Sequence, residues 1–354
     1  KITALCNPLL LERWSTALTE IRNLFTSLDH DGDGLLTFEE FREGWIANFK
    51  SSEEEIKSRF DQFDESGRGK ISAIEWTTVL RARETRQLAK ECLEEGPFTK
   101  ASLSEEEVEL MERMDERVHN LAALADTLGV RLLVDAEHTY FQPAIDNICL
   151  KLQRKFNING KDRVYNTYQC YLKDSSQKVD EYIQRSEYEG WEFAAKIVRG
   201  AYMHLERDRA AALGYPSPIH DTLQDTHDEY NRVIRRIIER DSVRNQQSNV
   251  NLVVASHNQE SVEQTIRVME QNKISKNKHN VYFGQLLGMA DNLTFALGRS
   301  GYTAYKYVPY GPIAEVMPYL VRRAQENSDI MGGVVRERKM LWQEFLSRLF
   351  PFMK

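Results

Sequence analysis

The sequence predicts an α/β fold in which parallel strands and helices alternate, with an all-helical module near the start of the chain. Three observations support this prediction. From Arg131 onward, short apolar or aromatic runs are separated by amphipathic helical stretches such as 222–240 and 259–272. Polar or turn residues follow several of these runs, and the segment before them is acidic and helical. Parallel strands separated by helices of this length form βαβ units.

The strands are expected at 131–137, 163–170, 193–202, 249–257, 281–287 and 303–308, with one more in residues 1–5. Functional groups at the carboxyl ends of several parallel strands are typical of the active-site face of a β/α-barrel. A doubly wound sheet is the alternative, but no Gly-x-Gly-x-x-Gly turn follows any strand. We therefore predict a (β/α)8 TIM-like barrel. Seven strands are visible in the sequence, so one is either missing from this chain or unrecognised.

The predicted organisation has four parts. Residues 1–8 hold a barrel strand, 9–82 an inserted helical pair, 83–130 a connector with outer helices, and 131–354 the barrel. The 354 residues suffice for a barrel core of roughly 200–250 residues and a second module. A net charge of −7, with 29% charged and 41% hydrophobic residues, is typical of a soluble globular protein and does not favour a nucleic-acid partner.

Targeting and redox signals are sparse. The four cysteines, Cys6, Cys92, Cys149 and Cys170, lack Cys-x-x-Cys spacing, which favours a reducing compartment. No stretch approaches the ~20 apolar residues that span a bilayer. The chain opens at Lys1 without a methionine or a signal or transit peptide, so we expect that the natural N-terminus has been removed.

Residues 29–40 fit the twelve-residue EF-hand calcium pattern at every diagnostic position. Gly34 permits the sharp turn of such a loop. The expected calcium ligands are the carboxylates of Asp29, Asp31 and Asp33, the carbonyl of Leu35 and the bidentate carboxylate of Glu40. The alternative is an acidic surface loop without a metal. We expect calcium to stabilise the inserted pair rather than to switch catalysis.

A second loop, 64–75, keeps Asp64 and Glu75 at its ends but has Arg68 at the fifth position. A guanidinium at a ligand position puts a positive charge where the cation should lie. We therefore interpret this loop as a pairing partner that binds calcium weakly or not at all. Its Ile71 and Leu36 of the first loop are expected to form the short strand pair that joins two EF-hands.

Near the end of the barrel, the spacing of Tyr319, Arg322, Arg323 and Glu326 places them on one face of a helix. Two adjacent guanidiniums repel each other unless an anion lies between them, and a substrate carboxylate bound through bidentate hydrogen bonds is a suitable anion. A solvent-exposed arginine pair is the alternative when the helix is considered alone.

The strand 196–202 alternates two cations with apolar residues and ends in Gly200-Ala201. A glycine there lets a flat ligand approach the backbone closely, and an inward lysine at 196 could stabilise charge on a reduced flavin ring. The alternative is a lysine paired with Asp135 or Glu137 inside the barrel. His257 and Asn258 are ambiguous in the same way, because a histidine at a strand end is often structural.

Together these residues resemble the proline dehydrogenase family of flavoenzymes, specifically its eukaryotic mitochondrial monofunctional members. The resemblance covers residues 1–5 and nearly everything from 131 to 326. The motifs that carry it are 134–137, 166–169, 196–202, 255–258, 284–289 and 307–311, followed by the helix with Arg322 and Arg323. The departures are the absent first strand, the sequence Ser-Pro-Ile-His-Asp at 217–221 where bacterial relatives place Thr and Lys near the FAD adenosine, and the EF-hand insertion.

The resemblance implies a distorted barrel that holds FAD at the carboxyl ends of its strands and oxidises L-proline to Δ1-pyrroline-5-carboxylate. Hydride would pass to flavin N5, and electrons would then pass to ubiquinone on the matrix side of the mitochondrial inner membrane. By position, Arg322, Arg323 and Lys1 would hold the substrate carboxylate. Tyr307, Tyr319 and Leu286 would enclose the substrate ring, and Asp135 would orient Lys196 near flavin N5. The FAD site would also include Asn166 or Gln169, Val198, Gly200, Tyr202, Ser256, His257, Asn258 and Glu326.

Three alternatives remain open. The sister enzyme hydroxyproline dehydrogenase is similar across the chain, but the Tyr307 phenol against C4 of the ring would crowd a hydroxyl there, which favours proline. A calcium-sensing scaffold without catalysis predicts loss of the cations, yet Lys1, Lys196, Arg322 and Arg323 are present. A barrel that uses a metal or a phosphorylated substrate needs clustered ligands or a phosphate loop at the strand ends, and the sequence offers neither.

Overall fold

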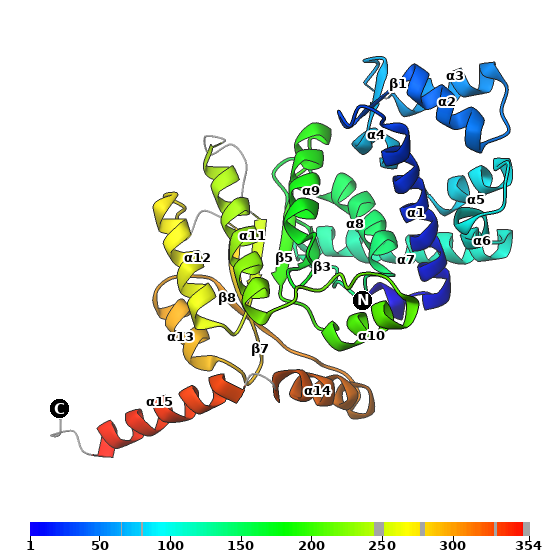
Figure 1. Cartoon of the computed structure of the whole chain (residues 1–354). Helices are drawn as coiled ribbons and strands as arrows, with labels where there is room; N and C mark the ends of the chain where they lie inside the picture. The colour runs from blue at the N-terminus through cyan, green and yellow to red at the C-terminus, as the bar shows by residue number, and fades with distance from the viewer. Residues whose placement is uncertain (65, 79–80, 244–250, 277–279, 329–330, 350–354) are drawn as a thin grey trace. The chain divides into compact units, whose positions relative to one another are not determined.

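The computed structural model describes the backbone of all residues except 65, 79–80, 244–250, 277–279, 329–330 and 350–354. The side chains of 78, 241–243, 280, 322–328 and 331–337 also lie outside the described part. The chain forms two compact units, which are described separately. Unit 1 contains Lys1–Thr167 and Asp180–Ala194, and unit 2 contains Tyr168–Val179 and Ala195–Lys354 (Figure 1).

The first part of the chain is mainly helical. Its elements are η1 (Ile2–Ala4), α1 (Pro8–Leu28), β1 (Leu35–Thr37), α2 (Phe38–Asn48), α3 (Glu53–Phe63), β2 (Lys70–Ser72), α4 (Ala73–Thr78), α5 (Ala82–Glu91), α6 (Pro97–Ala101) and α7 (Glu105–Leu128). Strands and helices then alternate through β3 (Leu132–Leu133), α8 (Gln142–Phe156), β4 (Val164–Gln169), α9 (Ser175–Glu189) and β5 (Ala194–Val198).

The remaining elements continue this alternation. They are α10 (Met203–Leu213), α11 (Leu223–Val243), β6 (Asn251–Ala255), α12 (Gln259–Gln271), β7 (Asn280–Leu286), α13 (Asp291–Arg299), β8 (Ala304–Tyr307), α14 (Ile313–Ser328) and α15 (Met331–Leu349). In the described part of the chain, β3 to β8 form one six-stranded sheet in strict chain order. A doubly wound sheet reverses its strand order at a switch point, so the sequential order favours the barrel prediction.

The six strands predicted from 131 onward are confirmed, each at its expected place. The strand predicted for residues 1–5 is wrong, because Ile2–Ala4 is a 3-10 helix. The backbone N–H groups of Ala4 and Leu5 donate to the carbonyls of Lys1 and Ile2, and that of Thr3 donates to Glu137 Oε1 at 3.0 Å. These local bonds replace the ladder that a strand would need.

Two helix–loop–helix units lie side by side in unit 1 (Figure 1). The predicted pairing is confirmed, because β1 and β2 are antiparallel with Leu36 opposite Ile71. Thr37 and Ser52 begin α2 and α3 with capping boxes. The two units share an aromatic core in which Phe41, Trp45, Phe63 and Trp76 are at least 96% buried. Ring centroids there lie 4.9–6.4 Å apart.

Asn157, at the end of α8, joins three segments of unit 1. Its side chain is fully buried, and its Oδ1 accepts from the backbone N–H groups of Arg163 and Val164 at 3.0 and 2.8 Å. Its Nδ2 donates to the carbonyls of Val164 and Glu192 at 2.8 and 3.1 Å. One amide therefore ties the end of α8 to the start of β4 and to the residues before β5.

We expect Asn157→Ala to lower the free energy of unfolding by about 2–4 kcal/mol, because it leaves several buried backbone groups without a partner. The control is Asn48→Ala, which removes an exposed amide that bonds only to the Gly44 carbonyl among the contacts described and should cost less than about 0.5 kcal/mol. Urea unfolding of both variants measures the difference, and equal losses would contradict this role of Asn157.

Candidate functional site

In the part of the sheet formed by β6, β7 and β8, one face is buried and the other, the open face, is exposed only toward the carboxyl ends of the strands, since Val253 and Tyr282 on it are 8% and 7% exposed. In the parallel register Ala255 lies beside Gly284, and Leu286 beside Tyr307. On the face bearing these four residues, the first three are partly exposed and Tyr307 is 49% exposed. The opposite face is formed in β6 and β7 by Leu252, Val254, Val281, Phe283 and Gln285, all at most 3% exposed. The open face is therefore available to a ligand near the carboxyl ends of the strands.

Strand β5 shows the same alternation. Ile197 is fully buried, whereas Lys196 and Val198 are partly exposed. Arg199 follows the strand and directs its guanidinium to Ser261 Oγ at 2.8 Å, on the outer helix α12, and to Nδ1 of a histidine on α11. Because successive side chains of a strand point to opposite faces, Lys196 and Val198 lie on the face away from these helices.

The turn after β5 requires a glycine at position 200. Gly200 has φ +131°, and a Cβ there would lie 2.5 Å from the ring of Tyr171. The Arg199 carbonyl accepts from the Tyr171 backbone N–H at 2.7 Å, which fixes this turn against the end of β4. Tyr202 then begins α10. Packing against Tyr171 therefore explains the glycine at position 200. Contact of Gly200 with FAD stays a prediction.

The end of β6 is held by its own hydrogen bonds. Ser256 Oγ accepts from the Asn258 backbone N–H at 3.0 Å and from Arg199 at 2.9 Å. Asn258 caps α12 through a bond from the Ser261 N–H. Nε2 of His257 accepts from the Leu286 N–H at 3.0 Å, so the imidazole is neutral and links β6 to β7. These side chains order the strand end, and a ligand at this edge would meet a preformed surface.

Two tyrosines meet at the end of β8. The ring centroids of Tyr307 and Tyr319, on α14, lie 5.8 Å apart. Leu286 is beside Tyr307 in the sheet, so the structure brings together the three residues predicted to enclose a substrate ring. Arg322, Arg323 and Glu326 belong to α14, but their side chains lie outside the described residues.

The remaining predicted barrel residues are placed as follows. In unit 1, Lys1 is exposed and Asp135 is partly exposed just after β3. Asn166 is fully buried in β4, with its Nδ2 donating to Asp146 Oδ1 at 2.9 Å. Gln169, at the end of β4 and in unit 2, is 4% exposed. Both amides are buried within the fold, whereas contact with FAD requires them to be accessible to it. Their contact with FAD stays a prediction.

The first loop of the helix pair gathers oxygen atoms. Carboxylate oxygens of Asp29, Asp31 and Glu40 all lie within 4.8 Å of one another. Asp29 Oδ1 is buried and has no hydrogen-bond partner among the described residues. Asp33 instead pairs with Lys70 Nζ from the second loop at 3.0 Å. The hydrogen bond from Lys70 is the main cause of the lowered pKa of Asp33. An oxygen-ligated cation fits this donor set.

Two cations on the helix-covered face of the sheet were not among the predicted site residues. Arg199 stacks 4.2 Å from the ring centroid of Tyr230, and burial lowers its pKa. Lys306 on β8 donates to the Met289 carbonyl at 2.6 Å and pairs with Asp291 at 2.7 Å, which anchors the turn after β7. Each of these cations interrupts an apolar run in the sequence, and this interruption was the signal by which it could have been found. Spacing alone does not reveal which face of the strand a cation occupies.

Comparison with known proteins gives a consistent result. The family model described as proline dehydrogenase matches residues 26–336. Human "Proline dehydrogenase 1, mitochondrial" is 40% identical over 99% of this chain and 60% of its own length. "Hydroxyproline dehydrogenase" of Xenopus laevis is 39% identical over 70% of this chain and 53% of its own length. The chain therefore spans between half and two thirds of the length of these curated relatives.

A solved structure shares the fold. Proline utilization A from Bdellovibrio bacteriovorus, described as inactivated by N-propargylglycine, matches with a TM-score of 0.55 and 24% identity. The match covers 62% of this chain and 22% of that protein. At this identity the likeness bears on the fold alone.

The state of His257 yields a pH prediction. Burial, and to a lesser extent the Lys306 ammonium, lower the pKa of His257 from its ordinary 6.5. The unfolded chain therefore takes up this proton first, so the stability tied to neutral His257 is complete above about pH 6.5 and is lost as pH falls through the lower folded pKa. NMR titration should give a midpoint below 6.5 and a concurrent shift of the Leu286 amide. A midpoint above 6.5 would contradict the bond to Leu286.

Proposed function

The chain belongs to the proline dehydrogenase family, and on that premise we propose that it oxidises L-proline to Δ1-pyrroline-5-carboxylate with FAD as its cofactor. The observation that carries this proposal is the open face of β5 to β8. It offers a flat backbone surface at Gly284, a cation at Lys196 and an apolar wall of Leu286, Tyr307 and Tyr319. Cofactor and ligand sites in such folds lie at the carboxyl ends of the strands.

These residues fit a planar cofactor. When bound, FAD would supply the hydride acceptor for the carbon next to the substrate nitrogen. Lys196 projects from the strand onto the open face, where its ammonium can stabilise negative charge on a reduced ring. Val198, Gly200, Tyr202, Ser256, His257, Asn258 and Glu326 complete the proposed cofactor set, with Asn166 or Gln169 as a more buried member.

The substrate would lie between the cofactor and α14. Leu286, Tyr307 and Tyr319 would form a largely apolar wall against the substrate ring. Lys1, Arg322 and Arg323 are the proposed partners of its carboxylate, and bidentate pairing with a guanidinium would orient the ring. Asp135 is the proposed partner of Lys196.

Proline is favoured over 4-hydroxyproline by two observations. Tyr307 lies beside Leu286 in the sheet, and in the proposed pose its phenol would crowd a hydroxyl at C4 of the ring. Human proline dehydrogenase 1 also matches 99% of the chain, against 70% for the frog hydroxyproline dehydrogenase. The human relative is named mitochondrial, which supports a mitochondrial location.

We further propose that electrons pass to ubiquinone and that the protein associates with the matrix side of the inner membrane without crossing it. No helix among the described residues is long and apolar enough to span a membrane. The support is α15, where Leu341, Trp342, Phe345 and Leu349 are 52–66% exposed. Their spacing puts them on one side of the helix, and basic residues flank them at 338, 339 and 348.

Calcium is the proposed occupant of the first loop, as a structural ion. The support is the buried, unpartnered Asp29 Oδ1 beside oxygens of Asp31 and Glu40. The carbonyl of Leu35 and the carboxylate of Asp33 would complete the ligand set. Since Asp33 is paired with Lys70, the ion would compete with an ammonium for one of its ligands.

The first experiment is anaerobic absorbance spectroscopy of the FAD-loaded protein with L-proline and with trans-4-hydroxy-L-proline. We expect the oxidised-flavin band to bleach faster with proline. Tyr307→Ala should shift the kcat/KM ratio toward hydroxyproline by roughly 10–100-fold, because it opens space at the ring. Phe295→Ala, which removes a 71% exposed aromatic side chain from α13, should leave the ratio unchanged. Bleaching with hydroxyproline alone would indicate the sister activity, and bleaching with neither would contradict the proposal.

For calcium, titration calorimetry should show that Asp31→Asn weakens binding by at least about tenfold. Asp61→Asn, which removes an exposed carboxylate outside the loops, should not change it. Lys70→Gln should tighten calcium binding by roughly 2–5-fold, because it removes an ion pair that competes for Asp33 and that is weak and exposed. Calcium should raise the melting temperature and leave turnover unchanged. A turnover that changes several-fold and reversibly with EGTA, at a constant melting temperature, would contradict a structural role.

For the membrane, the double variant Trp342→Ser/Phe345→Ser should bind vesicles containing an anionic phospholipid at least about tenfold more weakly, because two aromatic anchors are lost. Phe295→Ser removes a 71% exposed aromatic residue on α13 and serves as the control. Sedimentation with vesicles measures both, and equal binding of the double variant and the control would contradict a contact through α15.

A further inference from the structure

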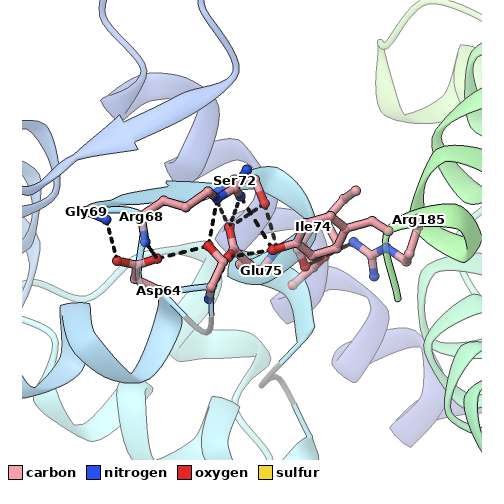
Figure 2. Close-up of polar contacts among 10 residues, drawn as sticks. Asp64, Arg68, Gly69, Ser72, Ile74, Glu75 and Arg185 are labelled. Carbon is pink, nitrogen blue, oxygen red and sulfur yellow. Dashed lines mark hydrogen bonds and ion pairs between the residues drawn. The ribbon is translucent and has the colours of Figure 1, made fainter. Parts of the chain in front are cut away.

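The second loop of the helix pair is closed by side chains of the chain itself. Both carboxylate oxygens of Asp64 are satisfied: Oδ1 accepts from the Arg68 N–H at 3.0 Å and from Ser66 Oγ at 3.2 Å, and Oδ2 accepts from the Gly69 N–H at 2.7 Å. The Arg68 side chain folds back over this loop (Figure 2). Its Nε donates to Ser66 Oγ at 2.7 Å and its Nη2 to Glu75 Oε2 at 3.2 Å.

Glu75, at the last position of the loop, is 1% exposed and fully hydrogen-bonded. Burial alone would raise its pKa, but hydrogen bonds from Ser72, Ser66 and Tyr188 outweigh this and bring the pKa of Glu75 to about 2. The carboxylate is therefore a buried anion, and buried charges in proteins are normally paired with an opposite charge or a metal. In a calcium loop the metal is that partner, and here the Arg68 guanidinium lies at that carboxylate.

Helix α9 contacts the same loop and the short helix after it. The Tyr188 hydroxyl donates to Glu75 Oε1 at 3.0 Å and accepts from Arg68 Nη2 at 3.5 Å. Arg185, one turn earlier, extends toward Ile74, and its Nη2 donates to the Ile74 carbonyl at 3.3 Å and to Thr77 Oγ1 (Figure 2). Arg185 is only 12% exposed. Tyr188 thus contacts the residues that close the loop, and Arg185 contacts the helix that follows it.

We propose that Arg68 takes the place of a metal ion in the second loop and that the loop, closed in this way, latches the helix pair to α9. The two loops then have different roles. The first has an unpartnered oxygen that can bind an ion, and the second uses an internal cation to attach the helix pair to α9. Attachment of the helix pair does not depend on calcium. The inference does not rest on catalysis or on calcium binding by the first loop.

The test is amide hydrogen exchange in EGTA, read at 66–75 and at 185–189. Arg68→Met should raise exchange rates in both segments at least about fivefold, because the closed loop and its contact with α9 open more often. The control is Arg42→Met, which removes a similarly exposed arginine, in an ion pair with Glu53, elsewhere in the helix pair. Tyr188→Phe, which removes only the hydroxyl bonded to Glu75 and Arg68, should raise exchange in both segments by a smaller factor. Rates for Arg68→Met equal to those of the control would overturn the proposal.

A second variant tests the metal substitution itself. Arg68→Asp places a carboxylate at the fifth position, beside Asp64, Ser66 and Glu75, and so restores a ligand set for calcium. We expect it to bind one more calcium ion per chain than the unmodified protein does. Exchange at 185–189 should be fast in EGTA and slow again in calcium. The same exchange rate in both conditions, with no added ion, would show that Arg68 does not stand in for a metal. Counting ions relative to the unmodified protein separates this outcome from any failure of the first loop.

Discussion

Burial of one face of the parallel sheet against its helices is the constraint on which the candidate site depends. Leu252, Val254 and Phe283 are completely buried, and the Tyr230 hydroxyl on α11 donates to the Ala255 carbonyl at 3.2 Å. Because strand side chains alternate, this burial sends the neighbouring residues to the opposite face. The open face and its tyrosines therefore follow from packing on the far side. Arg199 strengthens the arrangement by joining the end of β5 to Ser256 at the end of β6.

Much of this architecture could be predicted from the sequence, because six strands show short apolar runs followed by turn residues. The opening strand was wrong because a five-residue segment is too short for its periodicity to separate a strand from a turn of helix. The Glu137 carboxylate that holds Thr3 lies 134 residues away. The enclosure of Leu286, Tyr307 and Tyr319 came from resemblance rather than pattern. The roles of Arg199 and Lys306 could not be read, since they depend on which face each cation occupies.

The two loops of the helix pair share a pattern but differ in the contacts of their acidic residues: Asp33 pairs with Lys70, and Glu75 pairs with Arg68. The fifth position differs between the loops, with Asp33 in the first and Arg68 in the second. On our proposals it decides whether the shared acidic ends face a metal or a guanidinium. The short strand pairing of Leu36 with Ile71 connects the two loops. Lys70 of the second loop also forms an ion pair with Asp33 of the first. The sequence predicted the weak second loop from the misplaced charge. It could not predict the contact with Tyr188, because that partner lies 113 residues further along the chain.

The most direct measurement of the central claim is a hydrogen-exchange footprint of FAD on the chain. If the open face holds the cofactor, FAD should slow exchange at 196–202, 255–258 and 284–287. The outward surfaces of α11 and α12, and the helix pair, should be unchanged. Protection confined to the outer helices or to the helix pair, with the strand ends unaffected, would contradict the assignment of the site to this face.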